Sequence, residues 1–138
     1  MIKKAIILCG GTGSRMFPVT KSVNKQLLPL YDKPMFYYPL SLMMLSGIKE
    51  FIFIINERQE INFKKTIGDE KDLGIKIKYI VQSKPRGLPD AFILSQKFTQ
   101  NESVAMILGD NFFYGNMLSP IIKSSFKKTL GCNIYVYP

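Results

Sequence analysis

The residues best suited to chemistry follow the first apolar stretch of the chain. Residues 10–15, GGTGSR, come directly after the apolar residues 5–9. Glycines in such a turn let the backbone approach a phosphate closely while its N–H groups point at the anion. A glycine-rich turn alone is weak evidence for any one reaction. The stretch therefore predicts an anion-binding loop, and the identity of the anion must come from other residues.

Two familiar phosphate-binding motifs do not fit this turn. A Walker A loop needs Gly-Lys-Ser or Gly-Lys-Thr at a fixed spacing, and residues 10–18 contain neither. A dinucleotide-binding motif needs a helix that starts directly after the glycines and binds a pyrophosphate at its N-terminus. Phe17-Pro18 interrupts such a helix. The loop therefore belongs to neither class.

The chain has no histidine and two cysteines. The absence of histidine excludes Ser-His and Cys-His nucleophile pairs, histidine-ligated zinc and a histidine general base. Cys9 and Cys132 both lie in apolar stretches, where we expect buried, reduced thiols, and two thiols alone do not complete a metal site. Any chemistry must therefore use carboxylates, lysine and arginine, with or without a metal ion.

Short apolar stretches alternate with helix-like segments along the chain, a pattern typical of a parallel sheet covered by helices. The predicted strands are residues 4–9, 51–56, 75–82, 103–108 and 132–137. The first, second and fourth are nearly continuously apolar, as in strands buried on both faces, whereas lysines alternate with apolar residues in the third. We therefore predict a Rossmann-like α/β fold with three α/β/α layers and a mostly parallel sheet.

Capping residues predict where two helices begin and end. Asn56 with Gln59 resembles a capping box, and Gly68 stands where that helix should stop. Ser119 as N-cap and Pro120 at the first helical position predict a second helix that ends at residue 131.

The 138 residues contain no repeats, low-complexity tracts or linkers, so we expect one domain spanning residues 1–138. Residues 35–46 are apolar nearly all round and predict a helix in the core or against another subunit. They are too few for a membrane span, which needs roughly 20 residues. The basic and then apolar start runs into the glycine loop instead of a cleavage site. We therefore expect a cytoplasmic protein that spans no membrane.

The net charge of +9 makes a polyanionic partner worth considering. Only Arg15, Arg58 and Arg86 are arginines, and they are scattered, so recognition of bases by arginine is not expected. A solvated, lysine-rich surface is the preferred interpretation, and we expect no nucleic-acid partner.

Further motifs extend the glycine turn in a fixed order. They are RMFPVT at residues 15–20, KQLLP at 25–29, YDKPM at 31–35, YYPL at 37–40, VQ at 81–82, GL at 87–88 and LGDN at 108–111. With these motifs the entire chain resembles the N-terminal half of the sugar-1-phosphate nucleotidylyltransferases. It is most similar to the glucose-1-phosphate thymidylyltransferase branch of that family, since the motifs at 25–40 vary in the uridylyl, cytidylyl and adenylyl branches.

The resemblance implies a reaction between dTTP and glucose 1-phosphate, with Mg²⁺ as cofactor, that gives dTDP-glucose and pyrophosphate. A sugar-phosphate oxygen attacks the α-phosphorus in line, so the protein must position two polyanions and neutralise growing negative charge. The family is also homo-oligomeric, which implies self-association for this chain.

The resemblance also implies residue roles. Arg15 would grip the triphosphate with its planar fork, and Lys25 would place a point charge on the phosphates under attack. Asp110 follows an apolar strand at the sheet edge where ligands bind, and is the expected metal ligand, with a turn-stabilising aspartate as the alternative. Gln82 can donate to and accept from thymine or uracil. The expected nucleotide contacts are Leu8, Gly10, Gly11, Thr12, Gly13, Ser14, Gln26, Gln82, Gly87 and Leu88.

Some features depart from the family. Its members are about twice as long, and the part absent here normally supplies most sugar contacts and a second metal-binding aspartate. Ser14 replaces a commoner threonine, Asn56-Glu57 replaces a small-residue loop, and Pro89 replaces a typical alanine. Pro89 lacks a backbone N–H near the expected base pocket, so it could alter nucleotide choice.

Three interpretations stay open. The first is a shortened thymidylyltransferase that turns over weakly or not at all alone, with a UTP-using relative as its variant. The second is a non-catalytic nucleotide-binding or regulatory module that pairs with a full-length subunit through residues 35–46. The third, from charge alone, is a nucleic-acid-binding domain, which lacks the expected basic stripe with interleaved aromatic residues.

Overall fold

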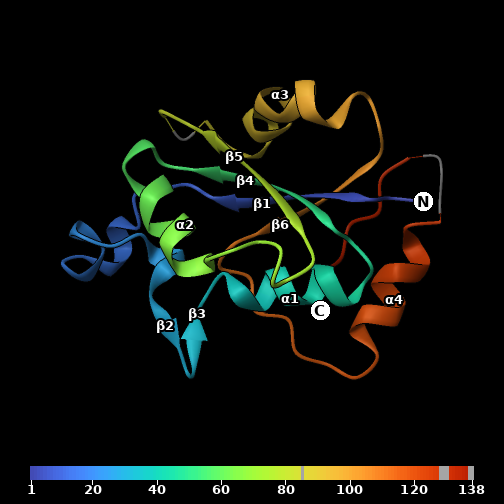
Figure 1. Cartoon of the computed structure of the whole chain (residues 1–138), viewed down its shortest axis with the longest axis horizontal. Coiled ribbons are helices and arrows are strands. Elements are labelled where there is room, and N and C mark those ends of the chain that lie inside the picture. Colours follow the sequence, from blue (N-terminus) through green and yellow to red (C-terminus); the bar gives the residue numbers. More distant parts are fainter. Residues whose placement is uncertain (85, 128–130, 137–138) are drawn as a thin grey trace.

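The computed structural model describes residues 1–84, 86–127 and 131–136. Its main sheet has four strands in the order β5–β4–β1–β6 (Figure 1). Their bounds are Lys4–Cys9 for β1, Glu50–Ile55 for β4, Lys76–Val81 for β5 and Val104–Leu108 for β6. Every neighbouring pair is parallel. The first four predicted strands are therefore confirmed, each to within a residue at either end.

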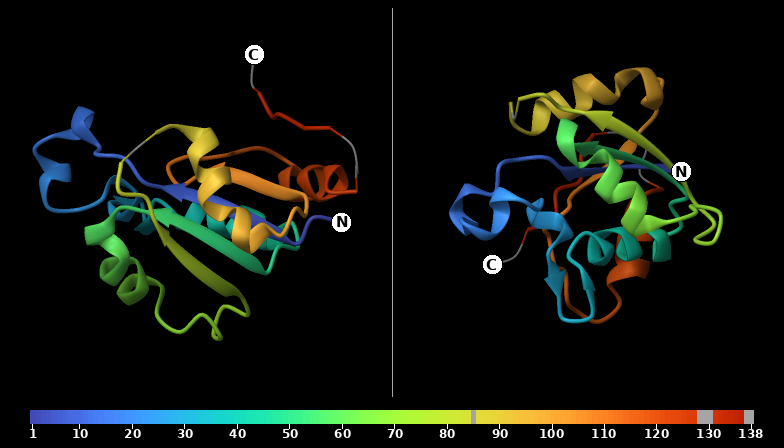
Figure 2. Two further views of the ribbon diagram at one scale, coloured as in Figure 1. Left: turned by 90° about the horizontal axis from the view of Figure 1, so that it is seen from above. Right: turned by 60° about the vertical axis from the view of Figure 1, so that its left-hand side comes forward.

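Helices cover both faces of this sheet. On one face lie α1 (Tyr37–Leu45), α2 (Glu60–Ile67) and α4 (Leu118–Ser125). On the other lies α3 (Leu88–Thr99), and Figure 2 shows the same layers from two further directions. The predicted three-layer, Rossmann-like arrangement is confirmed.

The helix α3 did not stand out in the sequence. Its buried positions are Ala91, Ser95 and Thr99, which are small or polar, whereas Phe92 and Ile93 are exposed. An amphipathic helix is recognised by a stripe of larger apolar residues on its buried side, and α3 has none.

The sheet is held between a large core and a small one. In the large core Phe36, Phe53 and Phe63 are fully buried, and the ring of Phe36 meets the other two edge-on at centroid distances of 5.9 and 5.3 Å. The small core, under α3, consists of Ile6, Ile52, Ile54 and Ala91. β1 and β4 contribute to both cores, which explains why their sequences are continuously apolar.

The boundaries of two helices require correction. α2 ends before Gly68 as predicted, but Asn56 does not cap it, because a 3₁₀ turn, Glu57–Gln59, comes first and the Asn56 side chain bonds elsewhere. α4 begins at Leu118, so Ser119 lies inside its first turn and does not cap it.

α4 also ends earlier than expected, at Ser125 instead of residue 131. The carbonyl of Phe126 accepts a hydrogen bond from the N–H of Ile2 at 3.3 Å, so the backbone just after α4 is bonded to the start of the chain. Residues 128–130 lie outside the described part of the chain.

The predicted strand at 132–137 is wrong for the described residues 132–136, which are irregular and exposed; residue 137 lies outside the description. Ile134 and Val136 are 80% and 84% exposed. A strand is stabilised by pairing, and none of the described strands pairs with this segment. The same finding corrects Cys132, which is exposed, whereas Cys9 is buried as predicted.

The helix predicted at 35–46 is present as α1. Pro39, Leu40 and Met43 are buried beneath the sheet, while Leu45 is 72% exposed. Within the residues that the structure describes, no helix combines the length and the apolar character that crossing a bilayer requires.

Candidate active site

Polar side chains gather at the carboxyl edge of the main sheet. Gly10 follows β1, Asn56 follows β4, Gln82 follows β5 and Asp110 comes shortly after β6. In an open parallel sheet this edge is where ligands bind. The order of the strands therefore brings four separate stretches of sequence to one place.

Lys25 and Asp110 meet at this edge although 85 residues separate them along the chain. Nζ of Lys25 lies 2.7 Å from Oδ2 of Asp110, and both side chains are about one-third exposed, at 33% and 27%. The distance is that of a charge-assisted hydrogen bond. The structure thus joins the residue expected to neutralise phosphate charge to the expected metal ligand.

Asn24 holds the turn that carries Lys25. This turn is a 3₁₀ helix, Lys25–Leu27, whose Gln26 N–H donates to Oδ1 of Asn24 at 2.8 Å. The Nδ2 of Asn24 donates to the carbonyl of Cys9 at 3.0 Å, and Asn24 is buried. One amide therefore ties Lys25 to the end of β1. We did not predict this role, although the preference of asparagine for N-cap positions could have indicated it.

Gly109 lets the end of β6 approach β1. A Cβ atom at this position would lie 2.5 Å from Sγ of Cys9, so no other residue fits without displacing the core. The N–H of Gly109 donates to the carbonyl of Leu8 at 2.8 Å. The backbone oxygen of Leu8, a residue expected to contact the nucleotide, is therefore already bonded within the protein. Burial, and to a lesser extent the charge of Asp110, raises the pKa of the Cys9 thiol, so Cys9 stays protonated.

The glycine loop is clamped from two sides. Gly11 and Gly13 have φ values of 100° and 61°, which favour glycine. The hydroxyl of Thr20 donates to the carbonyl of Gly13 at 2.6 Å. The Nδ2 of Asn56 donates to the carbonyl of Gly11 at 2.7 Å, and its Oδ1 accepts from the N–H of Gly11 at 3.3 Å. Asn56, expected to cap a helix, therefore positions the loop.

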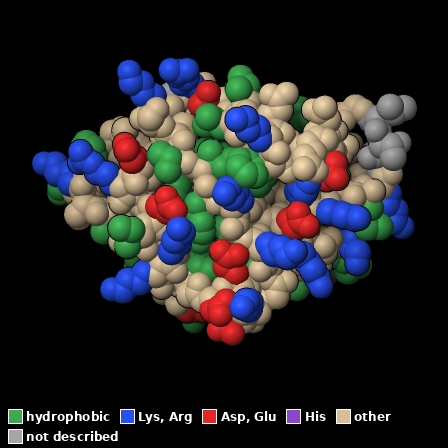
Figure 3. Space-filling model, turned by 45° about the horizontal axis from the view of Figure 1, so that its top comes forward, with side chains coloured by type: hydrophobic (Ala, Val, Ile, Leu, Met, Phe, Trp, Pro, Cys, Tyr) green, Lys and Arg blue, Asp and Glu red, His purple; other side chains and the backbone are tan. Residues whose placement is uncertain are grey.

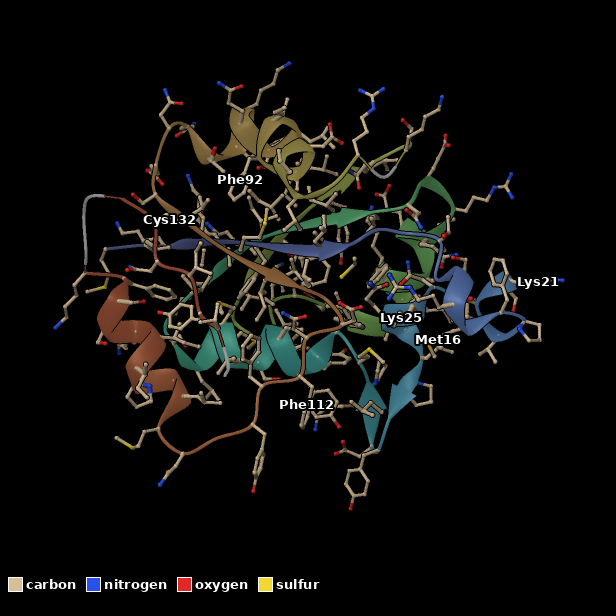
Figure 4. All side chains as sticks on the ribbon, turned by 180° about the vertical axis from the view of Figure 1, so that it is seen from behind. Met16, Lys21, Lys25, Phe92, Phe112 and Cys132 are labelled. Atoms are coloured by element: carbon tan, nitrogen blue, oxygen red, sulfur yellow. The ribbon has the colours of Figure 1, made fainter. Side chains whose placement is uncertain are left out.

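Arg15 is not part of the Lys25–Asp110 pair. It lies in a 3₁₀ turn, Ser14–Met16, and is exposed, as are Thr12 and Ser14. Among the described residues, none forms a hydrogen bond or an ion pair with the Arg15 guanidinium. Figure 4 places Lys25 and the loop that bears Met16 at one end of the molecule, with Cys132 at the other. Arg15 is therefore open to an incoming ligand.

Gln82 and Gln26 are both buried behind the loop, with 6% and 5% of their surface exposed. Nε2 of Gln82 donates to Oδ2 of Asp90 at 2.6 Å. The Oε1 atom of Gln26 has no hydrogen-bond partner in the described part of the chain. A buried acceptor without a partner is rare in proteins, and binding of a ligand is one explanation. The expected contacts Gly87, with φ of 86°, and Leu88 stand at the start of α3.

Asp110, the metal ligand expected from the sequence, lies at this edge with its carboxylate bonded to Lys25. The described residues contain no group of three or more histidine, cysteine, aspartate or glutamate side chains able to hold a metal. Mg²⁺ commonly binds through one or two carboxylates and completes its shell with waters and substrate phosphates. One carboxylate beside an anion-binding loop therefore fits Mg²⁺ that arrives with a nucleotide, and does not fit a metal cage made by the protein alone.

Relatives of known name resemble this chain over nearly all of its length. A glucose-1-phosphate thymidylyltransferase of Neisseria meningitidis is 46% identical over 134 residues, which are 97% of this chain and 46% of that protein. A glucose-1-phosphate thymidylyltransferase of Xanthomonas campestris pv. campestris is 40% identical over 135 residues, 98% of this chain and 46% of that protein. The chain thus spans about half the length of the curated relatives it matches.

Solved structures give the same result. A Bacillus anthracis protein assigned as a glucose-1-phosphate thymidylyltransferase, crystallised with sucrose, matches with a TM-score of 0.81 and 33% identity over 91% of this chain and 51% of its own. A UDP-glucose pyrophosphorylase in complex with UDP-glucose matches at 0.72 and 23%, over 92% and 54% of the two chains, which supports the fold alone. The sequence pattern that defines the nucleotidyl transferases covers residues 4–138, and the chain therefore belongs to the nucleotidyl transferase family.

Proposed function

We propose that this chain forms the nucleotide-binding part of a glucose-1-phosphate thymidylyltransferase, which transfers a thymidylyl group from dTTP to glucose 1-phosphate and releases pyrophosphate. The observation that carries the proposal is the 2.7 Å bond between Lys25 and Asp110 beside the glycine loop. A cation and a metal-binding carboxylate at an anion-binding turn are what phosphoryl chemistry requires.

The residues of this edge divide the work of binding. Backbone N–H groups of the glycine loop bind phosphate oxygens, and Arg15 pairs with them through its planar fork. Lys25 exchanges its bond to Asp110 for bonds to the phosphates, where its ammonium neutralises charge that grows during attack on the α-phosphorus. Asp110 would hold Mg²⁺, whose positive charge would neutralise phosphate oxygens and so reduce their repulsion of the incoming sugar phosphate.

Recognition of the nucleotide base is assigned to Gln82, together with Gly87 and Leu88. A glutamine amide offers a donor and an acceptor, which match the N3–H and O4 of thymine. Uracil has the same edge, so Gln82 does not separate dTTP from UTP. The preference for dTTP and the choice of glucose 1-phosphate rest on the names of the relatives and on the motifs at residues 25–40.

The net positive charge alone favours a nucleic-acid partner, but the distribution of the charged side chains does not. On the face that Figure 3 shows, lysine and arginine side chains are interspersed with aspartate and glutamate and form no stripe. A polyanion groove needs basic side chains that follow a track with aromatic residues between them. We therefore propose no nucleic-acid partner, and generic DNA serves as a negative control below.

A cytoplasmic, self-associating protein completes the proposal. Cys9 and Cys132 are free thiols, the usual state in a reducing compartment. Self-association is proposed from the resemblance to a homo-oligomeric family. Size-exclusion chromatography should give an apparent mass above 15.8 kDa, and a monomer at high concentration contradicts this part of the proposal.

Calorimetric titration with dTTP and Mg²⁺ tests the binding step. We expect saturable binding that Lys25→Met weakens by about tenfold, since a lost charged hydrogen bond costs about 1.5–3 kcal/mol. Lys76→Met, at the opposite edge, is the matched control and should bind like the unchanged protein. The proposal is contradicted if the folded chain does not bind dTTP. It is also contradicted if the chain binds generic DNA more tightly than dTTP, with an affinity that falls steeply with salt.

Pyrophosphate release in the presence of glucose 1-phosphate tests the transfer step separately. We expect weak release or none from these 138 residues alone, because most sugar contacts are expected outside them. Release at the rate of a longer relative, measured side by side, contradicts that expectation. Binding without release is the outcome that a nucleotide-binding module predicts.

A further inference from the structure

Asp90 fixes the side chain on which base recognition depends in the proposed function. Its Oδ2 accepts a hydrogen bond from Nε2 of Gln82 at 2.6 Å. The backbone of Gln82 is fixed as well, because its N–H donates to the carbonyl of Ile55 at 2.9 Å. With 6% of its surface exposed, Gln82 has little room to turn. The bond to Asp90 therefore decides which way its amide faces.

The chemistry of the Asp90 carboxylate determines that orientation. An ionised carboxylate has acceptors and no donor, so it attracts the NH₂ end of an amide and repels the oxygen end. Oε1 of Gln82 must then point away from Asp90. It lies beside the glycine loop, where a Cβ atom on Gly10 would come within 3.1 Å of it. Gln82 thus presents an acceptor and the remaining N–H of Nε2 in one fixed order.

The order matters because the pyrimidines differ in just this respect. Thymine and uracil present an acceptor at position 4 beside a donor at position 3, whereas cytosine presents a donor at 4 beside an acceptor at 3. An amide that turns freely matches either base by exchanging its two ends. An amide held in one orientation pairs its donor and acceptor correctly with one kind of base. With the other kind it places donor against donor and acceptor against acceptor.

We propose that Asp90 is a specificity-determining residue: by holding the Gln82 amide in one orientation it makes the site accept thymine or uracil and reject cytosine. Asp90 acts through Gln82 and contacts no base itself, so it is a positioning residue. The inference rests on the proposed role of Gln82 and adds to it the origin of base selectivity.

The start of α3 places Asp90 for this role. Gly87 caps the helix with φ of 86°, and Pro89 lies in its first turn, where its fixed φ suits the helix and its missing N–H is not needed. Asp90 follows in the same turn, pointing back to the end of β5. Pro89, for which the sequence suggested an effect on nucleotide choice, lies in the turn that carries Asp90 and restricts its backbone.

A first-turn aspartate also stabilises a helix through the helix dipole, so a change in stability alone would not identify the proposed role. The informative readout is the ratio of affinities for UTP and CTP. These nucleotides share sugar and phosphates and lack the thymine methyl group, so they differ only at the base edge that Gln82 faces. The ratio for dTTP and UTP is the internal control, since their edges are the same.

The experiment titrates the whole chain with UTP, CTP and dTTP in the presence of Mg²⁺. In the unchanged protein we expect UTP and dTTP to bind more tightly than CTP. Asp90→Asn, which can donate or accept, should reduce the UTP-to-CTP ratio by about tenfold, the value of one charged hydrogen bond, and leave the dTTP-to-UTP ratio unchanged. Asp90→Ala is a second variant with the same expected direction. Glu60→Gln, a first-turn acid on α2, is the matched control and should change neither ratio.

The outcomes distinguish a failure of the role inferred for Asp90 from a failure of the proposed function. If both Asp90 variants keep the UTP-to-CTP ratio of the unchanged protein, or weaken all three nucleotides equally, Asp90 has only a structural role and the inference is wrong. If the unchanged protein binds no nucleotide, the proposed function fails first. A reduced ratio in a variant that still binds dTTP supports both.

Discussion

The carboxyl and amino edges of the main sheet are made by the same four strands, yet they hold their polar side chains differently. At the carboxyl edge Asn24, Asn56 and Gln82 are buried or half-buried, and the side chain of each donates a hydrogen bond to a group on another structural element or loop. At the amino edge Lys49 and Lys76 are exposed and line an open hollow of about 860 Å³ beside the loop between α2 and β5.

The contrast shows that neither the number of charged side chains nor the volume of a hollow identifies the functional edge of the sheet. The hollow at the amino edge is roomy, but among the described residues the side chains of Lys49, Glu50 and Lys76, which line it, form no hydrogen bond or ion pair. At the carboxyl edge Asn24, Asn56, Gln82 and the Lys25–Asp110 pair are each held by a hydrogen-bonded neighbour, whereas Arg15 is exposed. Because ordering a side chain costs conformational entropy, polar groups fixed at one edge indicate where a ligand is bound. The predictions below test whether the two edges differ in this way.

Removing the Asp110 carboxylate should have the largest effect. Asp110→Asn takes away the expected metal ligand and leaves Lys25 without its partner, so Mg²⁺-dependent affinity for dTTP should fall by about 10- to 100-fold. Calorimetry with and without Mg²⁺ measures this change. Asp69→Asn, beside the hollow at the amino edge, is the control and should bind normally. Equal affinities in the two variants would remove the distinction between the edges.

Arg15 should follow in size. Arg15→Lys keeps the charge but loses the planar fork, so affinity for dTTP should still fall by about fivefold to tenfold, as judged by competition with a fluorescent nucleotide. Arg58→Lys changes an exposed arginine outside the glycine loop and should have no effect. If Arg15→Lys binds like the unchanged protein, charge alone suffices and a paired contact is not needed.

A smaller effect is expected from the clamp on the glycine loop. Asn56→Ala removes both hydrogen bonds to Gly11, so the free energy of unfolding should fall by about 1–2 kcal/mol and dTTP affinity by a few-fold. Urea titration and calorimetry measure the two changes. Asn62→Ala, on the exposed side of α2, is the matched control. A loss of stability without any loss of affinity would show that the loop needs no clamp to bind phosphate.

The smallest effect concerns an ion pair at the amino edge. The bond from Lys4 to Glu102, 2.9 Å long, lowers the pKa of the Glu102 carboxyl. A lowered pKa in the folded state adds stability above the unfolded pKa, and this is lost as pH falls through the folded value. Glu102→Gln should therefore be slightly less stable than the unchanged protein at about pH 7, with the gap closing towards about pH 3. A gap that widens on acidification contradicts this assignment.

Much of the fold could be predicted because it depends on local pattern. The continuous apolar stretches of β1 and β4 reflect burial on both faces, and Gly68 ends α2 as its conformational freedom suggests. The last stretch, 132–136, has an equally apolar sequence but no strand to pair with in the described structure. Apolar character predicts burial, whereas a strand also requires a neighbour, which the local sequence does not contain.

The candidate site shows the same division. Lys25 and Asp110 could be singled out by type and motif, and the structure brings them together. Asn24, Asn56 and Asp90 were not identified as parts of the site, because each acts through a hydrogen bond to a group that lies close to it only in the folded chain. An asparagine at a strand end reads as a helix cap unless the position of the Gly11 backbone is known.

One measurement tests the central claim most directly: the amide NMR spectrum of the chain titrated with dTTP and Mn²⁺ in place of Mg²⁺. The paramagnetic ion broadens signals close to it, so the account predicts that amides of residues 10–15, 25 and 110 lose intensity first, while those of residues 49 and 76 at the opposite edge persist. Broadening centred on the amino edge, or spread evenly over the protein, would contradict the assignment of a triphosphate site to the carboxyl edge.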